Sequence, residues 1–281
     1  MNSLKSKLLL IEGLPGSGKT TTAKISKEVL DELGIKNKLF LEGNLNHPAD
    51  YEGVAFFNKH EYYQLKEVFN KYNDLIENIS VKREKGYFIS YVKHKRELED
   101  DFPDELFNYI SKKDIYELSL EKNNKLIYNK WKRFSKRASE EETVYIFECC
   151  FIQNPITITV IRDNESKENA FNYINNLLDA VKSLSPTLLY IKQDDFIESF
   201  KKVVEERPKK WINSFIDYYT KQGYGLNENL KGLKGTIEVL KYRQEIEDEI
   251  FANLNIEKYV LNNSNYNKKQ TELKIKKILK E

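Results

Sequence analysis

Residues 8–20 read Leu-Leu-Leu-Ile-Glu-Gly-Leu-Pro-Gly-Ser-Gly-Lys-Thr, an apolar run that passes directly into a glycine-rich loop. The run at residues 8–12 is typical of a buried strand. Apolar residues recur at helical spacing over residues 21–33, and Gly34 is placed to end that helix in a left-handed conformation. The stretch therefore predicts a strand, a tight loop and a helix in direct succession.

The loop at residues 13–20 matches the phosphate-binding P-loop pattern G-x-x-x-x-G-K-[ST] at every fixed position. Glycines let backbone N–H groups curl around an anion, and the helix that follows turns its positive end toward phosphate. We expect Lys19 to lie along the β- and γ-phosphates of ATP as a catalytic cation, and Thr20 to coordinate Mg²⁺. The residues expected to bind the nucleotide are Gly13, Pro15, Gly16, Ser17, Gly18, Lys19, Thr20 and Thr21.

Composition limits what surrounds this loop. The chain has 281 residues, of which 40% are hydrophobic and 12% aromatic, enough for a sizeable core in one domain spanning residues 1–281. Its formal charge of +2 creates no field that would attract nucleic acid or an anionic membrane, so neither is an expected partner. The first apolar stretch is too short for a signal peptide, and the only cysteines, Cys149 and Cys150, are adjacent. We therefore expect a cytoplasmic protein.

Strand-like and helical segments alternate along the chain, which favours an α/β fold with helices on both faces of a mostly parallel sheet of about five strands. A strongly polar helix is also expected near the C-terminus, with Leu273, Ile275, Ile278 and Leu279 turned inward. The predicted strands are residues 8–12, 38–42, 143–148, 187–191 and 258–261.

Acidic residues end two of these strands. In open α/β sheets ligands bind beyond the carboxyl ends of the strands, so Glu42 and Glu148 should lie at the same edge as the loop. Glu148 is expected to hold Mg²⁺, as the Walker B acid does, and Glu42 to accept the proton of an attacking hydroxyl as a catalytic residue. The alternative for each is an exposed acid at a strand end.

The interval at residues 43–142 is far longer than an ordinary crossover and rich in aromatic residues, so we expect a helical insertion between the second and third strands. Most of its rings should pack a core, because buried aromatics usually supply area. Trp131 and Tyr51 are the first candidates for rings that face an acceptor pocket instead.

A cationic segment follows the predicted helix at residues 196–206. Pro208 breaks that helix beside Arg207, where a mobile lid over about residues 205–235 could fold over the phosphates. Arg207 would then neutralise charge on the transferring phosphoryl group as a third catalytic residue. A solvated basic turn is the alternative, and Lys209, Lys210 and Arg243 are weaker candidates for the same role.

Residues 13–20, with the acids at Glu42 and Glu148, make the chain resemble the P-loop kinases of small metabolites, in particular the thymidylate kinase and deoxynucleoside kinase group. The resemblance implies the three-layer P-loop NTPase fold and places Asn262, after the last strand, near the adenine base. Two features depart from the family pattern. Glu148 is followed by Cys149 rather than an arginine, and the lid segment contains only Arg207 where the family usually has two or three arginines.

These features predict a magnesium- and ATP-dependent phosphotransferase that acts on a small nucleoside- or nucleotide-like acceptor. An acceptor-independent ATPase or nucleotide-dependent switch is the alternative, and a non-catalytic nucleotide-binding module would follow if Glu42 and Glu148 were turned away from the loop. The acceptor itself stays open among a nucleoside, a nucleotide and a hydroxyl compound such as an antibiotic.

Overall fold

The computed structural model describes residues 5–83 and 85–279, which form two compact units. The first unit comprises Met1–Glu42 and Trp131–Glu281, and the second comprises Gly43–Lys130. The second unit begins at residue 43, where the predicted insertion begins. It ends at Lys130, before the predicted end at residue 142.

The first unit is built on a five-stranded parallel sheet in the order β2-β6-β1-β7-β8. This confirms the expected α/β architecture with a parallel sheet of about five strands. The second strand ends two residues earlier than predicted, so that Glu42 lies in the connection beyond it. The strands are β1 Leu8–Gly13, β2 Asn37–Phe40, β6 Val144–Glu148, β7 Thr187–Lys192 and β8 Glu257–Asn262.

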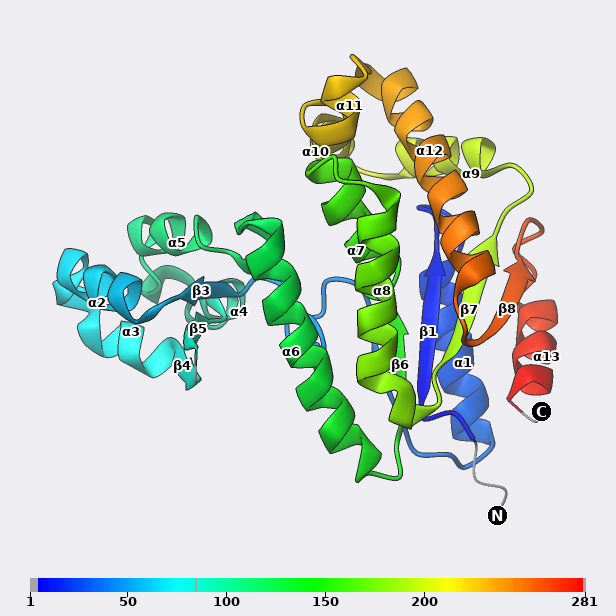
Figure 1. The fold of residues 1–281 in the computed structure, drawn as a ribbon, viewed down its shortest axis with the longest axis horizontal. Helices are drawn as coiled ribbons and strands as arrows, with labels where there is room; N and C mark the ends of the chain where they lie inside the picture. The colour runs from blue at the N-terminus through cyan, green and yellow to red at the C-terminus, as the bar shows by residue number, and fades with distance from the viewer. Residues whose placement is uncertain (1–4, 84, 280–281) are drawn as a thin grey trace. The chain divides into compact units, whose positions relative to one another are not determined.

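The central strand β1 is buried on both faces, as its continuous apolar sequence predicts. Side chains of β1 that alternate along the strand pack against different helices. Leu9 and Ile11 join a core with residues of α1 (Lys19–Glu32) and α13 (Lys268–Ile278), which lie on one face of the sheet. Figure 1 shows α8 (Lys167–Val181) and α12 (Gly232–Asn253) on the other face. Two helical layers therefore enclose the sheet.

The first helix ends as the sequence predicts. Gly34 has a φ of 68°, and its N–H donates to the carbonyl of Asp31 over 3.0 Å. Ile35 N–H donates to Leu30 over 2.9 Å, which completes a left-handed helix stop.

Further helices of the first unit lie beside these layers and around the ends of the strands. Arg207 follows the end of α9, and the predicted lid residues 205–235 contain α10, α11 and the start of α12. A π-helical turn, Thr157–Arg162, extends α7 directly. The other segments are α6 Leu120–Ser139, which begins in the second unit, α7 Gln153–Ile156, the 3₁₀ turn Lys182–Leu184, α9 Phe196–Glu206, α10 Lys209–Thr220 and α11 Gly223–Asn227.

The short helix α11 approaches the π-helical turn very closely. A Cβ added to Gly223 would lie 2.1 Å from the carbonyl oxygen of Ile161, and one added to Gly225 would lie 2.0 Å from that of Tyr219. Only glycine allows these backbones to meet, so Gly223 docks α11 against the π-helical turn and Gly225 docks it against α10.

The second unit contains the predicted helices and, in addition, an antiparallel sheet in the order β3-β5-β4. An insertion made of helices alone was therefore an incomplete prediction. Strands of three or four residues are too short to produce a recognisable alternation in the sequence. The segments are β3 Ala55–Phe57, α2 Lys59–Val68, α3 Asn73–Ile79, β4 Ser80–Arg83, β5 Gly86–Ile89, α4 Tyr91–Leu98 and α5 Asp104–Ser111, with 3₁₀ turns at Asn70–Tyr72, Glu99–Asp101 and Ile115–Glu117.

Two apolar side chains lie elsewhere than the sequence predicts. Trp131, a candidate for the acceptor pocket, is fully buried in the core of the first unit, with its ring centroid 6.0 Å from Phe147 and 5.9 Å from Phe151. Leu273, expected to turn inward, is 59% exposed, whereas Ile275 on the same helix is fully buried. Of the four residues expected to turn inward at the C-terminal helix, Leu273 was therefore wrongly placed.

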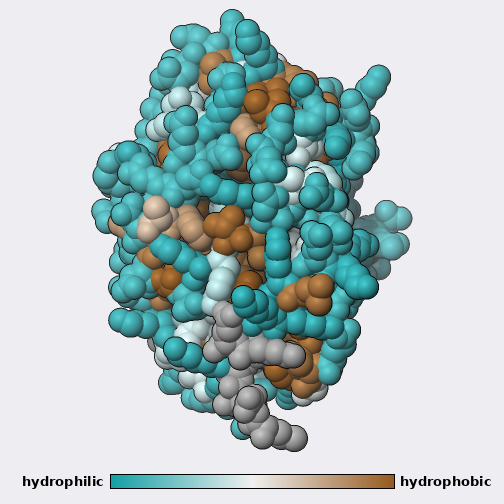
Figure 2. Space-filling model, turned by 90° about the vertical axis from the view of Figure 1, so that its right-hand side faces the viewer, coloured by the Kyte–Doolittle hydropathy of each residue, from teal (hydrophilic) through white to brown (hydrophobic). Residues whose placement is uncertain are grey.

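The surface seen from the side of β8 and α13 is mostly hydrophilic, with hydrophobic side chains gathered in separate patches (Figure 2). Val260 on the edge strand β8 is 48% exposed. Within residues 5–83 and 85–279, no helix combines the length and apolar character that crossing a membrane requires.

The two sides of α13 give a matched test of the core. Replacing Ile275 by Ala removes buried methylene groups and leaves a cavity, so we expect the free energy of unfolding to fall by about 2–5 kcal/mol. Leu273→Ala on the exposed side should change it by less than about 0.5 kcal/mol. Urea unfolding of both variants measures this, and similar losses for the two would contradict the assigned helix face.

Candidate functional site

The Gly13–Thr20 segment bends sharply between β1 and α1. Gly13, Gly16 and Gly18 have φ values of 143°, 83° and 96°, a range that favours glycine. A Cβ on Gly13 would lie 2.4 Å from the carbonyl oxygen of Ile191, and one on Gly18 would lie 2.2 Å from Asn263 Nδ2. The glycines are therefore required both by backbone conformation and by close neighbours.

The helix that follows the loop starts at Lys19, two residues earlier than predicted. Gly18 precedes it, and no side chain in the described part of the chain caps its first turn. The first N–H groups of a helix have no partner within the helix, and they carry the positive end of its dipole. An anion is the natural partner for such an uncapped helix start.

Side chains from two other loops hold the glycine-rich loop in place. Asn263 Nδ2 donates to the carbonyl oxygen of Ser17 over 2.9 Å. Gln193 Nε2 donates to the same oxygen and to the carbonyl of Asn263, each over 3.2 Å. On another side Gly16 touches α9, since a Cβ there would lie 2.9 Å from Val203.

Three residues predicted to share a site come together at the end of β6. Thr20 Oγ1 donates to Glu148 Oε1 over 2.5 Å, and the backbone N–H of Glu42 donates to Glu148 Oε2 over 3.2 Å. Glu148 is buried, whereas Thr20 and Glu42 are exposed. The Glu42 carboxylate accepts a hydrogen bond of 2.8 Å from Gln153 Nε2, so it is held beside this cluster rather than turned away.

Lys19 is buried next to these acids. Its Nζ donates to the carbonyl oxygen of Leu14 over 3.0 Å. Burial alone would lower the pKa of Lys19, but the neighbouring carboxylates of Glu42 and Glu148 act against it, and the pKa is raised. Lys19 therefore stays positively charged at neutral pH.

A buried acid that the sequence analysis did not single out shapes the turn after β6. Glu12 accepts hydrogen bonds from the backbone N–H groups of Phe151, over 2.7 Å, and Gln153, over 3.0 Å. Cys149 in this turn has a φ of 69°. Glu12 thus fixes the segment from which Gln153 reaches Glu42. The one acid in an otherwise apolar strand was the signal that could have identified it.

Burial acts on both ionisable groups of this turn. It raises the pKa of Glu12 to about 7, against the lowering effect of the backbone hydrogen bonds. It also raises the pKa of the Cys149 thiol well above its usual range. Cys149 is therefore a neutral thiol at the position where the resembled family has an arginine.

A cavity of about 740 Å³ opens in the first unit from the loop to α9, α10 and α12. Its volume falls within the usual range for small-molecule sites. It contains Lys19, Thr20, Glu42 and Glu148 together with five aromatic rings. Other residues that line it are Pro15, Gly16, Gly18, Thr21, Gln153, Thr157, Arg207, Trp211, Phe215, Tyr218, Tyr219, Arg243 and Tyr266.

The remaining predicted residues occupy different places. Arg207 lines the cavity and is exposed, with its guanidinium 5.4 Å from the centroid of the Trp211 ring. Asn262 does not line it, and its Nδ2 donates to Asp194 Oδ1 over 2.6 Å. Gly13 and Ser17, both within the loop, are buried and do not line the cavity.

Arg243, a weaker candidate in the sequence, lines the cavity and is only 1% exposed. Its Nε pairs with Glu247 Oε1 over 2.6 Å, and its Nη1 donates to Tyr219 Oη over 3.0 Å and to Thr157 Oγ1 over 3.4 Å. The sequence spacing of Arg243 and Glu247 is that of an exposed helix pair, which is why it gave no sign of a buried cation.

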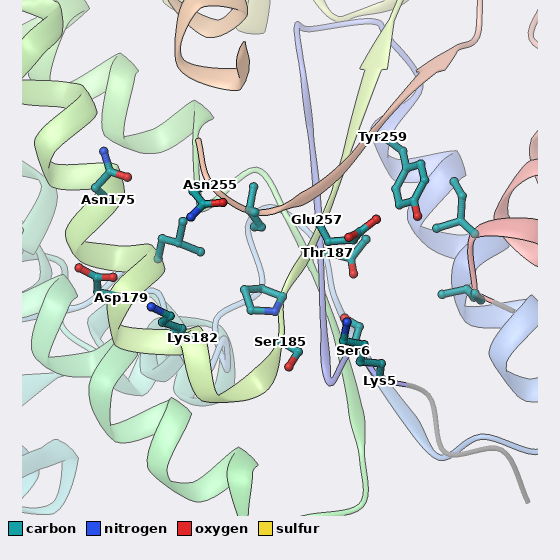
Figure 3. A pocket seen from close by; sticks show the side chains of 15 residues that line it. Lys5, Ser6, Asn175, Asp179, Lys182, Ser185, Thr187, Asn255, Glu257 and Tyr259 are labelled. Atoms are coloured by element: carbon teal, nitrogen blue, oxygen red, sulfur yellow. The ribbon is translucent and has the colours of Figure 1, made fainter. Parts of the chain in front are cut away.

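A second cavity of about 500 Å³ lies at the amino-terminal ends of the strands (Figure 3). Asp179 of α8 and Lys182 of the 3₁₀ turn that follows line it, with Glu257 at the start of β8 and Lys5 before β1. Its charges are of both signs, and none of the residues predicted to act in a site lies there.

The site at the carboxyl ends of the strands can hold a phosphorylated ligand with a hard metal ion. The uncapped start of α1 and Lys19 suit phosphate oxygens, while Thr20 and Glu148 offer the hard oxygen ligands that Mg²⁺ prefers. Comparison of the sequence with protein-family models and with curated proteins finds no match. The chemistry of this site therefore depends on its own geometry.

The buried Glu12 predicts a pH dependence of stability. Its pKa in the folded chain, about 7, lies above the ordinary value of 4.5, so the folded state binds more protons between these pH values and loses stability as the pH rises through them. We expect the loss between pH 5 and pH 8 to be smaller in Glu12→Gln by up to about 3 kcal/mol.

Urea unfolding at the two pH values measures this difference. The exposed Glu205→Gln, on α9, is the control and should show the same loss as the native chain. An unchanged loss in Glu12→Gln would show that the carboxyl does not titrate in this window.

Proposed function

We propose that the chain is a P-loop phosphotransferase that uses magnesium and ATP to phosphorylate a small nucleoside- or nucleotide-like acceptor. The observation that carries this proposal is the meeting of Lys19, Thr20, Glu148 and Glu42 at one cavity. A cation, a metal-binding pair and a further carboxylate near the acceptor are the parts that phosphoryl transfer requires.

The position of the loop in the sheet supports nucleotide binding. The chain passes from β1 to β2 and β6 on one side and to β7 and β8 on the other. Ligands of open α/β sheets bind at such a reversal, beyond the carboxyl ends of the strands. The strand order and the two helical layers are compatible with the three-layer P-loop NTPase fold that the resemblance implies.

On the triphosphate side, backbone N–H groups at the start of α1 would bind phosphate oxygens, and Lys19 would neutralise their charge. Thr20 and Glu148 would hold the magnesium ion. The bound magnesium nucleotide supplies the activated phosphoryl group. Arg207 lines the same cavity just after the end of α9. Because its side chain is exposed, it would be able to reach a phosphoryl group bound there.

On the acceptor side, Glu42 would orient a hydroxyl group and take its proton. Gln153 fixes one oxygen of the Glu42 carboxylate, and the other lies 3.5 Å from Cys149 Sγ. Both neighbours are uncharged hydrogen-bond donors, so neither forms an ion pair with the carboxylate. The thiol itself offers no positive charge to a phosphoryl group, so that charge must come from Lys19 and the arginines of the cavity.

The direct test is a panel of acceptors. ATP consumption with Mg²⁺ is measured against nucleosides, nucleoside monophosphates and hydroxylated antibiotics, and products are detected by mass. We expect one class to gain a single phosphoryl group and to stimulate consumption. Steady hydrolysis that no acceptor changes would instead support an acceptor-independent ATPase or switch.

Two substitutions test the roles within the site. Lys19→Ala should lower transfer by at least about 10²-fold, because a preorganised charge on the reacting phosphates is lost. Glu42→Gln should leave ATP binding intact and lower turnover. Lys24→Ala, an exposed lysine on the same helix α1, is the control and should retain full activity.

Single-turnover kinetics and nucleotide binding distinguish these effects. Transfer at the native rate by Lys19→Ala would remove that residue from the mechanism. Native turnover by Glu42→Gln would do the same for the carboxylate.

A further inference from the structure

Three aromatic rings of α10 form a continuous stack along the cavity. Trp211, Phe215 and Tyr219 follow one another at four-residue spacing and all line it. The ring centroids of Trp211 and Phe215 are 5.0 Å apart with planes 24° from parallel, and those of Phe215 and Tyr219 are 4.5 Å apart at 27°. Trp211 is 38% exposed, so a planar ligand can pack against this stack.

The stack ends at a buried guanidinium. The hydroxyl of Tyr219, the last ring, accepts a hydrogen bond from Arg243 Nη1, and Arg243 lines the same cavity. Among the described residues that line it, Lys19 and Arg243 are the two cations that are buried. An aromatic wall and a desolvated positive charge therefore meet at one place.

The hydrogen bonds of Arg243 are incomplete. Its Nε and Nη1 have the partners Glu247, Tyr219 and Thr157, but Nη2 is buried and makes no hydrogen bond to any residue that the structure describes. A buried charged donor without an acceptor carries a desolvation penalty that nothing repays. An oxyanion bound at this end of the cavity would supply the missing acceptor.

Arg243 belongs to a different wall of the cavity from the phosphate-binding loop. Gly16 of the loop packs against α9, and Gly18 packs against Asn263. Arg243 is held instead by α10 and by Thr157, which follows Gln153 on the segment that fixes Glu42. The guanidinium thus shares its supports with the acceptor side of the proposed site.

We infer that Arg243 and the ring stack of α10 form a subsite for an acceptor that combines a planar ring with an oxyanion, a phosphate or a carboxylate. This inference rests on the proposed function and narrows its acceptor class from neutral or charged compounds to anionic ones.

Trp211 provides the readout, because it lines the cavity while Trp131 is fully buried in the core. Tryptophan fluorescence is titrated with nucleoside 5′-monophosphates, with the matching nucleosides, and with pyrimidine carboxylates. At least one anionic compound should bind about 10- to 100-fold more tightly than its neutral counterpart. The monophosphate and carboxylate arms identify which oxyanion is recognised, and Trp211→Phe should abolish the signal.

Arg243→Met should remove the preference for the anion. Because that variant leaves Glu247 buried without its partner, the double variant Arg243→Met/Glu247→Gln is measured beside it, with circular dichroism melts as a check of folding. Lys241→Met removes a cation from the same helix that pairs with Glu238 and does not line the cavity, and it should bind as the native chain does.

Variants of Lys19 and of Arg243 distinguish a failure of the subsite from a failure of the phosphotransferase. Lys19→Ala should lose ATP binding and keep the anionic ring compound, whereas the Arg243 variants should do the reverse. If the native chain binds no ATP but still prefers the anion through Arg243, the phosphotransferase proposal fails and the subsite stands as a binding site. Three results would overturn the inference. They are equal binding of neutral and anionic compounds, no binding of any anionic compound, and Arg243 variants that lose only the binding of ATP.

Discussion

The candidate site depends on one carboxylate that joins distant parts of the chain. Glu148 accepts from the Thr20 hydroxyl, 128 residues away in sequence, and from the Glu42 backbone, 106 residues away. Each segment arrives at this point on its own strand, and the parallel order of β2, β6 and β1 places the three strand ends side by side. Glu148 can hold both because it is buried, where a hydrogen bond to a charged group is stronger than in water.

A buried ion pair, Arg243 and Glu247, lies at the wall of the cavity formed by α10 and α12, and its burial carries a desolvation penalty. Arg243 and Glu247 are almost completely desolvated, and their mutual attraction offsets that penalty only with good geometry and further hydrogen bonds. Tyr190 donates to Glu247 and Tyr219 accepts from Arg243, so a strand and two helices share the pair. An apolar replacement of similar volume could stabilise the fold equally well, which agrees with a role for the pair beyond stability.

Local patterns in the sequence predicted local structure well, and the rule for strand ends predicted that Glu42 and Glu148 lie beside the loop, but the partners of single buried side chains were missed. The strand, loop and helix around Gly13–Thr20 follow from neighbouring residues, and they form as expected. Glu12 was not singled out because its partners, the N–H groups of residues 151 and 153, belong to another strand end. Arg243 was undervalued because a helix spacing does not reveal burial. The small sheet of the second unit was not predicted, because hydrogen bonds between separate strands hold it together and no single strand is long enough to show a pattern.

The two glycines of α11 fix backbone contacts to two neighbouring segments of the first unit. Gly223 and Gly225 meet main-chain carbonyls of Ile161 and Tyr219 at distances that tolerate no side chain. The contact of Gly223 joins residues 161 and 223 across a long loop, and closing such a loop carries an entropic cost. A methyl group at position 225 would press on the backbone of Tyr219, and so on the ring stack of α10, although residue 225 does not itself line the cavity.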